Sequence, residues 1–149
     1  MKAALRQRAL ALGFDDCRVT TADAPGFASR FTQWLAERRH GEMAYLERTA
    51  PKRVDPRQVL PGARSIIMLA ASYHDPKWLS GPIARYACYR DYHDILAECL
   101  KQLAEFVNRL GGEGTRSLWY VDTGPLLERD LAQRAGLGFI GKHTNLISR

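Results

Sequence analysis

The sequence predicts an α/β or α+β domain with a mixed central sheet flanked by helices. Two observations support this prediction: strand and helix patterns alternate along the chain, and residues 65–72, SIIMLAAS, are almost continuously apolar. Such a run is typical of a central strand covered on both faces. Alternating strands and helices favour layers packed around one core. A chain of 149 residues is long enough for one such domain.

The first half of the chain alternates short helical and strand patterns. Gly13 suits the left-handed end of a first helix, and Pro25 suits the start of a second. The second helix spaces its apolar residues as one stripe, most of which we expect in the core: Phe27, Phe31, Trp34 and Leu35. The predicted elements are helices over residues 1–13, from Pro25, over 42–48 and over 57–60, and strands over 17–20 and 65–72.

The second half begins with a loop over residues 74–82 and continues with the longest helix candidate. Residues 91–110 repeat apolar side chains with helical spacing, and glycines at 111, 112 and 114 stop the pattern. The remaining predicted elements are a buried strand over 117–121, a helix over 126–135 that begins after Pro125 and ends at Gly136, and a strand beginning near Asn145.

Several function classes are disfavoured by composition. No stretch approaches the roughly 18 uninterrupted apolar residues of a membrane span, and the N-terminus does not resemble a signal peptide, so we expect a cytoplasmic protein without a membrane partner. The cysteines are odd in number and form no C-x-x-C, which disfavours a disulfide framework or a zinc site. Cys17 and Cys99 are expected as small apolar residues of the core.

The net charge of +6 leaves two interpretations open. A basic surface can attract a polyanion such as RNA. It can equally be a solvated basic surface, and no aromatic-rich RNA-binding signature accompanies it. The positive charge is densest between residues 38 and 64.

Asp122 is the acid with the clearest chemical interest. It follows the predicted strand at 117–121, and ligands of open α/β sheets bind where strands end and helices begin. A partly desolvated acid there could hold a proton near neutral pH and act as a general acid. The alternative is that Asp122 caps the helix that follows Pro125. From spacing alone, the interpretation of Asp122 as a helix cap is favoured over that of a general acid.

A glycine-rich block, GLGFIGKHTN, occupies residues 136–145. Its glycines allow close approach of the backbone to a ligand, or simply a cap and a turn. The block is not a phosphate loop, because His143 follows Lys142 where serine or threonine is needed. It is not a dinucleotide fingerprint either, because no strand precedes the glycines.

A third block, RYACYRDYH at residues 85–93, is rich in aromatic and ionisable side chains. His93 could be a proton donor or a metal ligand, but a hydrogen-bonded partner at a helix start is the more ordinary interpretation. No second histidine or cysteine stands at ligand spacing from it, so no metal site built by the protein is expected.

Several blocks then stand in a characteristic order: HGEMAYL at 40–46, DPR at 55–57, LPGARS at 60–65, RYAxxRDYH at 85–93, VDTGP at 121–125, LER at 127–129 and AGLGFIGKHTNLI at 135–147. Together they resemble the N-terminal half of epoxyqueuosine reductases. The resemblance covers nearly the whole chain. Each block alone would be weak, whereas their combination is specific.

The resemblance implies a cobalamin-dependent oxidoreductase that reduces the epoxide of epoxyqueuosine in a tRNA anticodon to queuosine. It implies one cobalamin-binding catalytic domain over residues 1–149, with a nitroreductase-like or corrinoid-reductase-like fold, and it makes Asp122 the general acid. The expected cofactor-binding residues are Gly138, Ile140, Gly141, Lys142, Asn145, Arg85 and Tyr86. We expect a monomer whose partners are tRNA and an electron donor.

Two departures from the family pattern qualify this expectation. Tyr89 stands where the family commonly has glycine. There is no C-x-x-C-x-x-C-x-x-x-C-P run, so 4Fe–4S clusters are expected only from a missing domain or a partner, and the chain is expected to be incomplete at its C-terminal end and inactive alone. A corrinoid-binding module without epoxide chemistry, or a flavin-dependent reductase on a related scaffold, remains an alternative.

Overall fold

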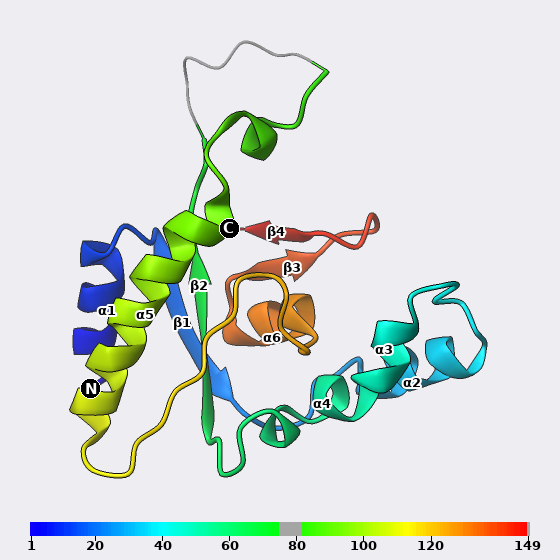
Figure 1. Ribbon diagram of the computed structural model, residues 1–149, viewed down its shortest axis with the longest axis horizontal. Coiled ribbons are helices and arrows are strands. Elements are labelled where there is room, and N and C mark those ends of the chain that lie inside the picture. The colour runs from blue at the N-terminus through cyan, green and yellow to red at the C-terminus, as the bar shows by residue number, and fades with distance from the viewer. Residues whose placement is uncertain (75–81, 149) are drawn as a thin grey trace. The chain divides into compact units, whose positions relative to one another are not determined.

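Helices and short strands make up the chain in the computed structural model, which describes residues 1–74 and 82–148 except the side chains of Arg85 and Tyr86. The mixed α/β character expected from the sequence is confirmed. In chain order the elements are α1 (Lys2–Ala11), β1 (Asp16–Thr21), α2 (Ala28–Ala36), α3 (Ala44–Arg48), α4 (Ala50–Val54), η1 (Pro56–Gln58), β2 (Ser65–Ala70), η2 (Arg85–Cys88), α5 (Tyr92–Gly111), α6 (Glu128–Ala135), β3 (Gly138–Ile140) and β4 (Leu146–Ser148) (Figure 1).

The strands of the described residues form two separate two-stranded sheets, β1–β2 and β3–β4. The backbone N–H of Asp15 donates to the carbonyl of Ala70 at 2.8 Å, and that of Ala22 to Arg64 at 3.1 Å, so β1 and β2 run antiparallel. The predicted mixed central sheet is therefore wrong for this part of the chain. β2 is also only half-buried, because β1 is its one strand neighbour among the described residues.

The chain divides into two compact units, the first of which is Met1–Cys17 with Leu69–Val121. In this unit α1 packs against α5 (Figure 1). Gly13 ends the first helical segment with φ of 95°, as predicted. The buried side chains of this unit come mainly from α1 and the residues that follow it: Leu5, Ala9, Phe14, Cys17 and Leu103.

The second unit is Arg18–Met68 with Asp122–Arg149, and α6 is its most buried helix. Leu131 and Ala132 lie in its core. The buried carboxylate of Asp130 accepts a hydrogen bond from the Phe27 backbone at 2.7 Å. Because a buried carboxylate needs such a donor, this bond fixes α6 to the start of α2.

Arg134, one helical turn after Asp130, binds the end of β1 and the residues that follow it. Its guanidinium donates to the Thr20 hydroxyl at 3.1 Å and to the carbonyls of Thr21, Asp23 and Ala24 at 2.6, 3.1 and 2.9 Å. A planar guanidinium presents five N–H donors in a rigid fork, whereas a lysine ammonium presents three at a single point. α6 thus fixes the segment at 20–24.

Several local predictions need correction. Residues 117–121 form no strand in the described structure, and Leu118 and Trp119 are 54% and 41% exposed, so these side chains are not those of a buried strand. The apolar stripe of α2 is half-buried and not core. The helix α4 was not predicted, since Pro51 at its first turn resembled a loop signal. The expected loop at 74–82 falls mostly outside the described residues.

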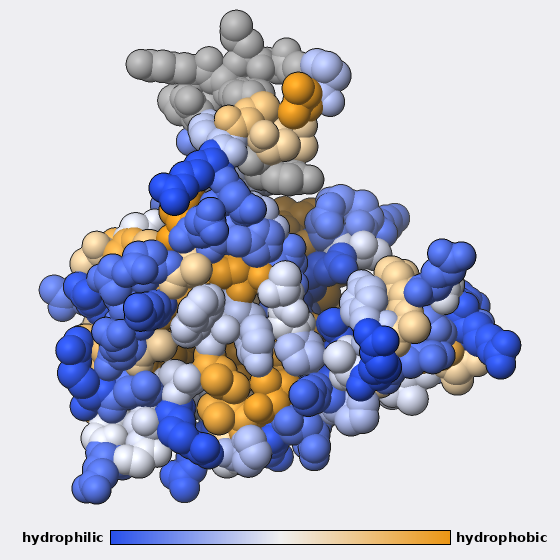
Figure 2. Space-filling model, in the orientation of Figure 1, coloured by the Kyte–Doolittle hydropathy of each residue, from blue (hydrophilic) through white to orange (hydrophobic). Residues whose placement is uncertain are grey.

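Apolar side chains remain on the surface between hydrophilic ones (Figure 2). Isolated exposed apolar residues are ordinary in soluble domains. Within the described residues, no helix combines the length and the apolar character that a membrane crossing requires.

Candidate active site

Asp122 occupies the turn that leads from the extended residues 117–121 toward α6. Its backbone is left-handed, with φ of 59°, a region that few residues other than glycine adopt. Its side chain is exposed. The helix begins at Glu128 and has Leu127 at its N-cap, so Asp122 does not cap it. The structure therefore removes the cap interpretation that spacing alone favours.

A second carboxyl, Glu128, lies half-buried in the first turn of α6. Burial raises the pKa of Glu128 to about 6, and the negative charge of Asp122 adds to this effect, while the Arg53 guanidinium opposes it. Arg53 is held by hydrogen bonds to the Thr49 hydroxyl at 3.0 Å and to the Leu126 carbonyl at 3.3 Å. Asp122, Glu128 and Arg53 therefore form one group of interacting charges.

The sequence patterns do not single out Glu128 or Arg53 as members of this group. A signal exists for Glu128, because it is an acid in the first turn of a helix that follows Asp122 closely. No comparable signal exists for Arg53. It belongs to α4 and reaches a carbonyl 73 residues away in the sequence, which only the folded chain reveals.

A hairpin formed by β3 and β4 brings several predicted cofactor-binding residues together. The strands pair antiparallel, and the backbone N–H of Gly141 donates to the carbonyl of Asn145 at 2.9 Å to close the turn. The side chains of Lys142 and Asn145 are exposed. The predicted residues that this hairpin carries are Gly138, Ile140, Gly141, Lys142 and Asn145.

The glycines of this hairpin are needed by the chain itself. A Cβ atom at Gly138 would lie 2.0 Å from the carbonyl oxygen of Ile147, and one at Gly141 would lie 2.6 Å from the ring of His143. Strand pairing and the turn thus already account for glycine at both positions. That these glycines also admit a ligand stays a prediction.

One face of the hairpin is apolar and exposed. Phe139 stands opposite Ile147 in the strand register, and the two side chains are 51% and 39% exposed. Successive residues of a strand point to opposite faces, so Gly138 and Ile140 point away from this surface. An apolar face bordered by the polar side chains of Lys142 and Asn145 could receive a large ligand of mixed polarity.

The block at residues 85–93 lies in the first unit. The backbone of Arg85 and Tyr86 belongs to η2, but their side chains lie outside the described residues. The imidazole Nδ1 of His93 lies 2.8 Å from the Asp91 carboxylate, and the His93 backbone N–H lowers the pKa of Asp91. The ordinary interpretation of His93 as a hydrogen-bonded partner is confirmed. The described residues hold no cluster of potential metal ligands.

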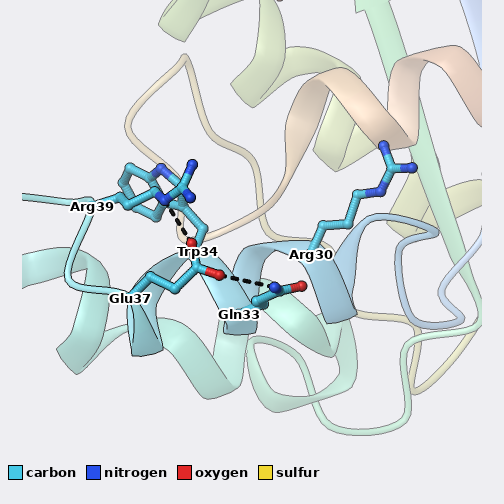
Figure 3. Close-up of a pocket in the computed structure, with 5 residues that line it drawn as sticks. All are labelled: Arg30, Gln33, Trp34, Glu37 and Arg39. Carbon is cyan, nitrogen blue, oxygen red and sulfur yellow. Dashed lines mark hydrogen bonds and ion pairs between the residues drawn. The ribbon is translucent and has the colours of Figure 1, made fainter.

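A shallow hollow of about 300 Å³ lies along α2 (Figure 3). Its polar side chains bind one another: Arg39 pairs with Glu37 at 2.6 Å, and Gln33 donates to Glu37 at 2.9 Å. Trp34 and Arg30 complete the lining. The hollow contains none of the predicted site residues. We place the candidate site at Asp122 and not here, because Arg39, Glu37 and Gln33 already bind one another.

Sequence comparisons agree with the blocks noted above. The family profile described as "Epoxyqueuosine reductase QueG, DUF1730" matches residues 53–123. The epoxyqueuosine reductase of Gloeobacter violaceus is 43% identical over 152 residues, which cover 98% of this chain and 47% of that relative. The chain belongs to the epoxyqueuosine reductase family. It spans about half the length of the curated relatives that it matches.

Solved epoxyqueuosine reductases resemble the chain along 99% of its length. The Streptococcus thermophilus structure is 28% identical with a TM-score of 0.83. An epoxyqueuosine reductase with a tRNA-Tyr epoxyqueuosine-modified stem loop is 30% identical with a TM-score of 0.78. The Bacillus subtilis enzyme, with an aspartate-bearing catalytic loop swung out of its active site, is 28% identical with a TM-score of 0.77. The chain covers 42%, 41% and 41% of these structures.

Proposed function

We propose that this chain is the N-terminal module of a tRNA epoxyqueuosine reductase and that Asp122 is its general acid. The observation that carries the proposal is Asp122 on a left-handed turn, interacting with the half-buried acid Glu128, in a chain of this family. Non-glycine residues in this conformation are often associated with functional sites. A catalytic loop that bears an aspartate in the Bacillus subtilis relative supports the assignment.

The proposed reaction removes the epoxide oxygen as water and leaves an alkene, which takes a pair of electrons and a pair of protons. The carbon–oxygen bond breaks readily only if the departing oxygen receives a proton. Asp122 holds its carboxyl on an exposed turn, where a substrate base can reach it. Its role is to give that proton to the oxygen, and a second proton comes from solvent.

We propose cobalamin as the cofactor, bound at the β3–β4 hairpin. Its ring has apolar faces and an amide-bearing rim, which suits exposed Phe139 and Ile147 beside the polar side chains of Lys142 and Asn145. When bound, the cobalt centre supplies the electrons, while the protein positions the reactants. Gly138, Ile140 and Gly141 of the same hairpin belong to the proposed binding set. The sequence-based prediction of Arg85 and Tyr86 as cofactor-binding residues stays a prediction, because their side chains lie outside the described residues.

The remaining parts of the proposal concern the context of the chain. Residues 1–149 would form one catalytic domain of nitroreductase-like or corrinoid-reductase-like fold, in a monomeric cytoplasmic protein. Electrons would come from 4Fe–4S clusters of another domain or of a partner protein. The substrate would be tRNA with a queuosine-type anticodon, in line with the relative solved with a modified tRNA stem loop.

The cofactor proposal is tested by titrating the chain with cob(II)alamin under argon and recording absorbance. A saturable shift at about one cofactor per chain is expected, and Lys142→Ala should weaken it. The matched control is Lys101→Ala, on the exposed side of α5. No shift in a folded chain, or no effect of Lys142→Ala, would count against the hairpin as the cofactor site. Yellow protein that carries a flavin would favour a flavin-dependent reductase.

The acid is tested by measuring reduction of epoxyqueuosine in tRNA with titanium(III) citrate as electron source. Asp122→Asn should lower the rate at least about 100-fold without changing cobalamin affinity, because only the proton donor is lost. Asp94→Asn, at an exposed position of α5, is the control. If wild type binds cobalamin but never reduces the epoxide, the chain is a corrinoid-binding module without this chemistry.

A further inference from the structure

The densest positive charge of the chain lies on the segment that contains α3 and α4. Residues 38–64 hold seven arginine or lysine residues and three acids, which gives this segment a net charge of +4 within a chain of +6. Two of the acids are engaged locally. Glu47 pairs with the His40 imidazole at 2.9 Å, and Asp55 accepts a hydrogen bond from the Arg57 backbone at 3.0 Å. The acids of this segment therefore leave an excess of positive charge.

Two cations of this segment, Arg48 and Lys52, have exposed side chains. Within residues 1–74 and 82–148, neither side chain makes a hydrogen bond or an ion pair. Arg57 provides the contrast, since its guanidinium pairs with the Asp23 carboxylate. An anionic ligand can therefore bind Arg48 and Lys52 without first displacing a carboxylate of the described chain.

The helices α3 and α4 place these two cations on the same face as an aromatic ring. The Thr49 N–H donates to the Tyr45 carbonyl, and the Arg53 N–H donates to the Thr49 carbonyl, both at 3.1 Å. Helical hydrogen bonding thus continues across the junction of α3 and α4. Tyr45, Arg48 and Lys52 stand at helical spacings of three and four residues, which put them on one face. These three residues are called the basic stripe, and its Tyr45 side chain is 48% exposed.

Arg53 connects the basic stripe to the candidate active site. Its guanidinium carbon lies 6.0 Å from the centroid of the Tyr45 ring, a cation–π contact that holds the ring in place. The same guanidinium donates to the Thr49 hydroxyl at 3.0 Å and to the Leu126 carbonyl at 3.3 Å. Leu126 follows Asp122 by four residues. One side chain therefore joins the stripe to the segment that carries the proposed general acid.

The side chains of the stripe suit RNA. Arginine and lysine neutralise backbone phosphates, and exposed aromatic rings stack on unpaired bases. We propose that the basic stripe binds the tRNA beside the base that reaches Asp122, with phosphates on Arg48 and Lys52 and an unpaired base on Tyr45. The inference rests on the proposed function, which makes tRNA the substrate, and it names the surface that holds this tRNA.

The charged part of the stripe is tested by the binding of a fluorescently labelled tRNA anticodon stem loop to the whole chain, followed by anisotropy at several salt concentrations. Combining Arg48→Gln with Lys52→Gln should weaken binding at least about tenfold at low salt. It should also lower the slope of log Kd against log salt concentration by about 1.4 to 1.8, because two phosphate contacts are lost. The matched control combines Lys101→Gln with Arg109→Gln on α5, which removes the same charge from exposed positions and should have little effect. Equal losses in both double variants, or wild-type affinity in the stripe variant, would overturn the proposal.

The aromatic part of the stripe is tested in the same assay. Tyr45→Ala should weaken binding about fivefold and leave the salt slope unchanged, because stacking and not charge is lost. Tyr45→Phe keeps the ring and should bind like wild type. On a fully paired RNA duplex of the same length, Tyr45→Ala should have no effect, because no base is free to stack. An equal loss on the duplex, or the same loss in Tyr45→Phe, would contradict stacking on Tyr45.

These binding measurements need neither a cofactor nor electrons, so they separate the inference from the proposed function. If the chain binds RNA through the stripe but never reduces epoxyqueuosine, the proposed function fails and the stripe remains an RNA-binding surface. If the chain reduces epoxyqueuosine while the stripe variants bind RNA like wild type, the inference alone fails.

Discussion

The guanidinium of Arg129 donates hydrogen bonds to the backbone carbonyl of Thr144 at 2.6 Å and to its hydroxyl at 3.2 Å. Thr144 has a left-handed backbone with φ of 66°, and its own N–H donates to the Gly141 carbonyl. The helix that carries Glu128 thus also holds the turn of the proposed cofactor hairpin. Glu128 and the turn of the hairpin are therefore both attached to one element, α6.

Arg129→Ala should loosen this turn. We expect a loss of about 1 kcal/mol in the free energy of unfolding, since a charge-assisted but exposed hydrogen bond is removed. Amide hydrogen exchange at Gly141 and Thr144 should become faster. Arg6→Ala, on the exposed side of α1, should change neither quantity. An unchanged rate of amide hydrogen exchange at Gly141 and Thr144 in Arg129→Ala would show that the turn is stable without Arg129.

The two hairpin glycines should respond differently to alanine. Gly138→Ala places a Cβ against the backbone of Ile147, which cannot move without breaking strand pairing, so about 3 kcal/mol of stability should be lost. Gly141→Ala meets the ring of His143, which can rotate, and should cost about 1 kcal/mol. Urea denaturation compares the variants. Equal effects would contradict the different neighbours of the two positions.

Arg134→Met should destabilise the chain by about 2 kcal/mol, because the carbonyl groups of Thr21 and Ala24 lose hydrogen bonds from a charged donor. Arg134→Lys should recover little of this loss, since an ammonium cannot reproduce the fork of hydrogen bonds. Urea denaturation at constant pH measures both. Wild-type stability in Arg134→Lys would mean that charge alone, and not geometry, holds this segment.

Glu128 should make stability depend on pH. Its pKa rises from 4.5 to about 6 on folding, so the folded chain binds more protons than the unfolded chain between these values. Stability is then full below pH 4.5 and falls as the pH rises through 6. The loss is at most about 2 kcal/mol, and less because solvent screens a half-buried group.

The comparison with Glu128→Gln isolates this effect. At pH 8 the variant should be more stable than wild type by that amount, and the difference should disappear at pH 4. Urea denaturation across this range provides the measurement. A constant difference at every pH would show that packing of the amide, and not ionisation of Glu128, separates the two proteins.

Local sequence signals predicted most elements of this fold. Gly13 and Gly136 end helices in left-handed conformations, and the helical spacing of residues 91–110 corresponds to α5 within about one residue. The prediction of a strand at 117–121 was wrong because an apolar run alone does not supply a pairing partner. β3 was missed because Gly138 and Gly141 weaken a strand pattern, and only the close backbone of Ile147 explains them.

The candidate site was predicted only in part. The sequence identified Asp122 and the hairpin residues as candidate site residues, because they belong to characteristic sequence blocks. It could not bring out Arg53, whose place near Glu128 depends on the docking of α4 beside the chain at Leu126. Burial of Glu128, which sets its proton affinity, is likewise a property of packing and has no local sequence pattern.

The contacts of Arg134 have a consequence for the order in which the chain folds. The Thr20 hydroxyl that it binds lies 114 residues earlier, so closing this loop costs about 4 kcal/mol of length-dependent chain entropy. The helix α6 and its hairpin involve only residues near one another and can form without that cost. During synthesis, residues 20–24 therefore cannot form their hydrogen bonds with Arg134 until Arg134 has left the ribosome.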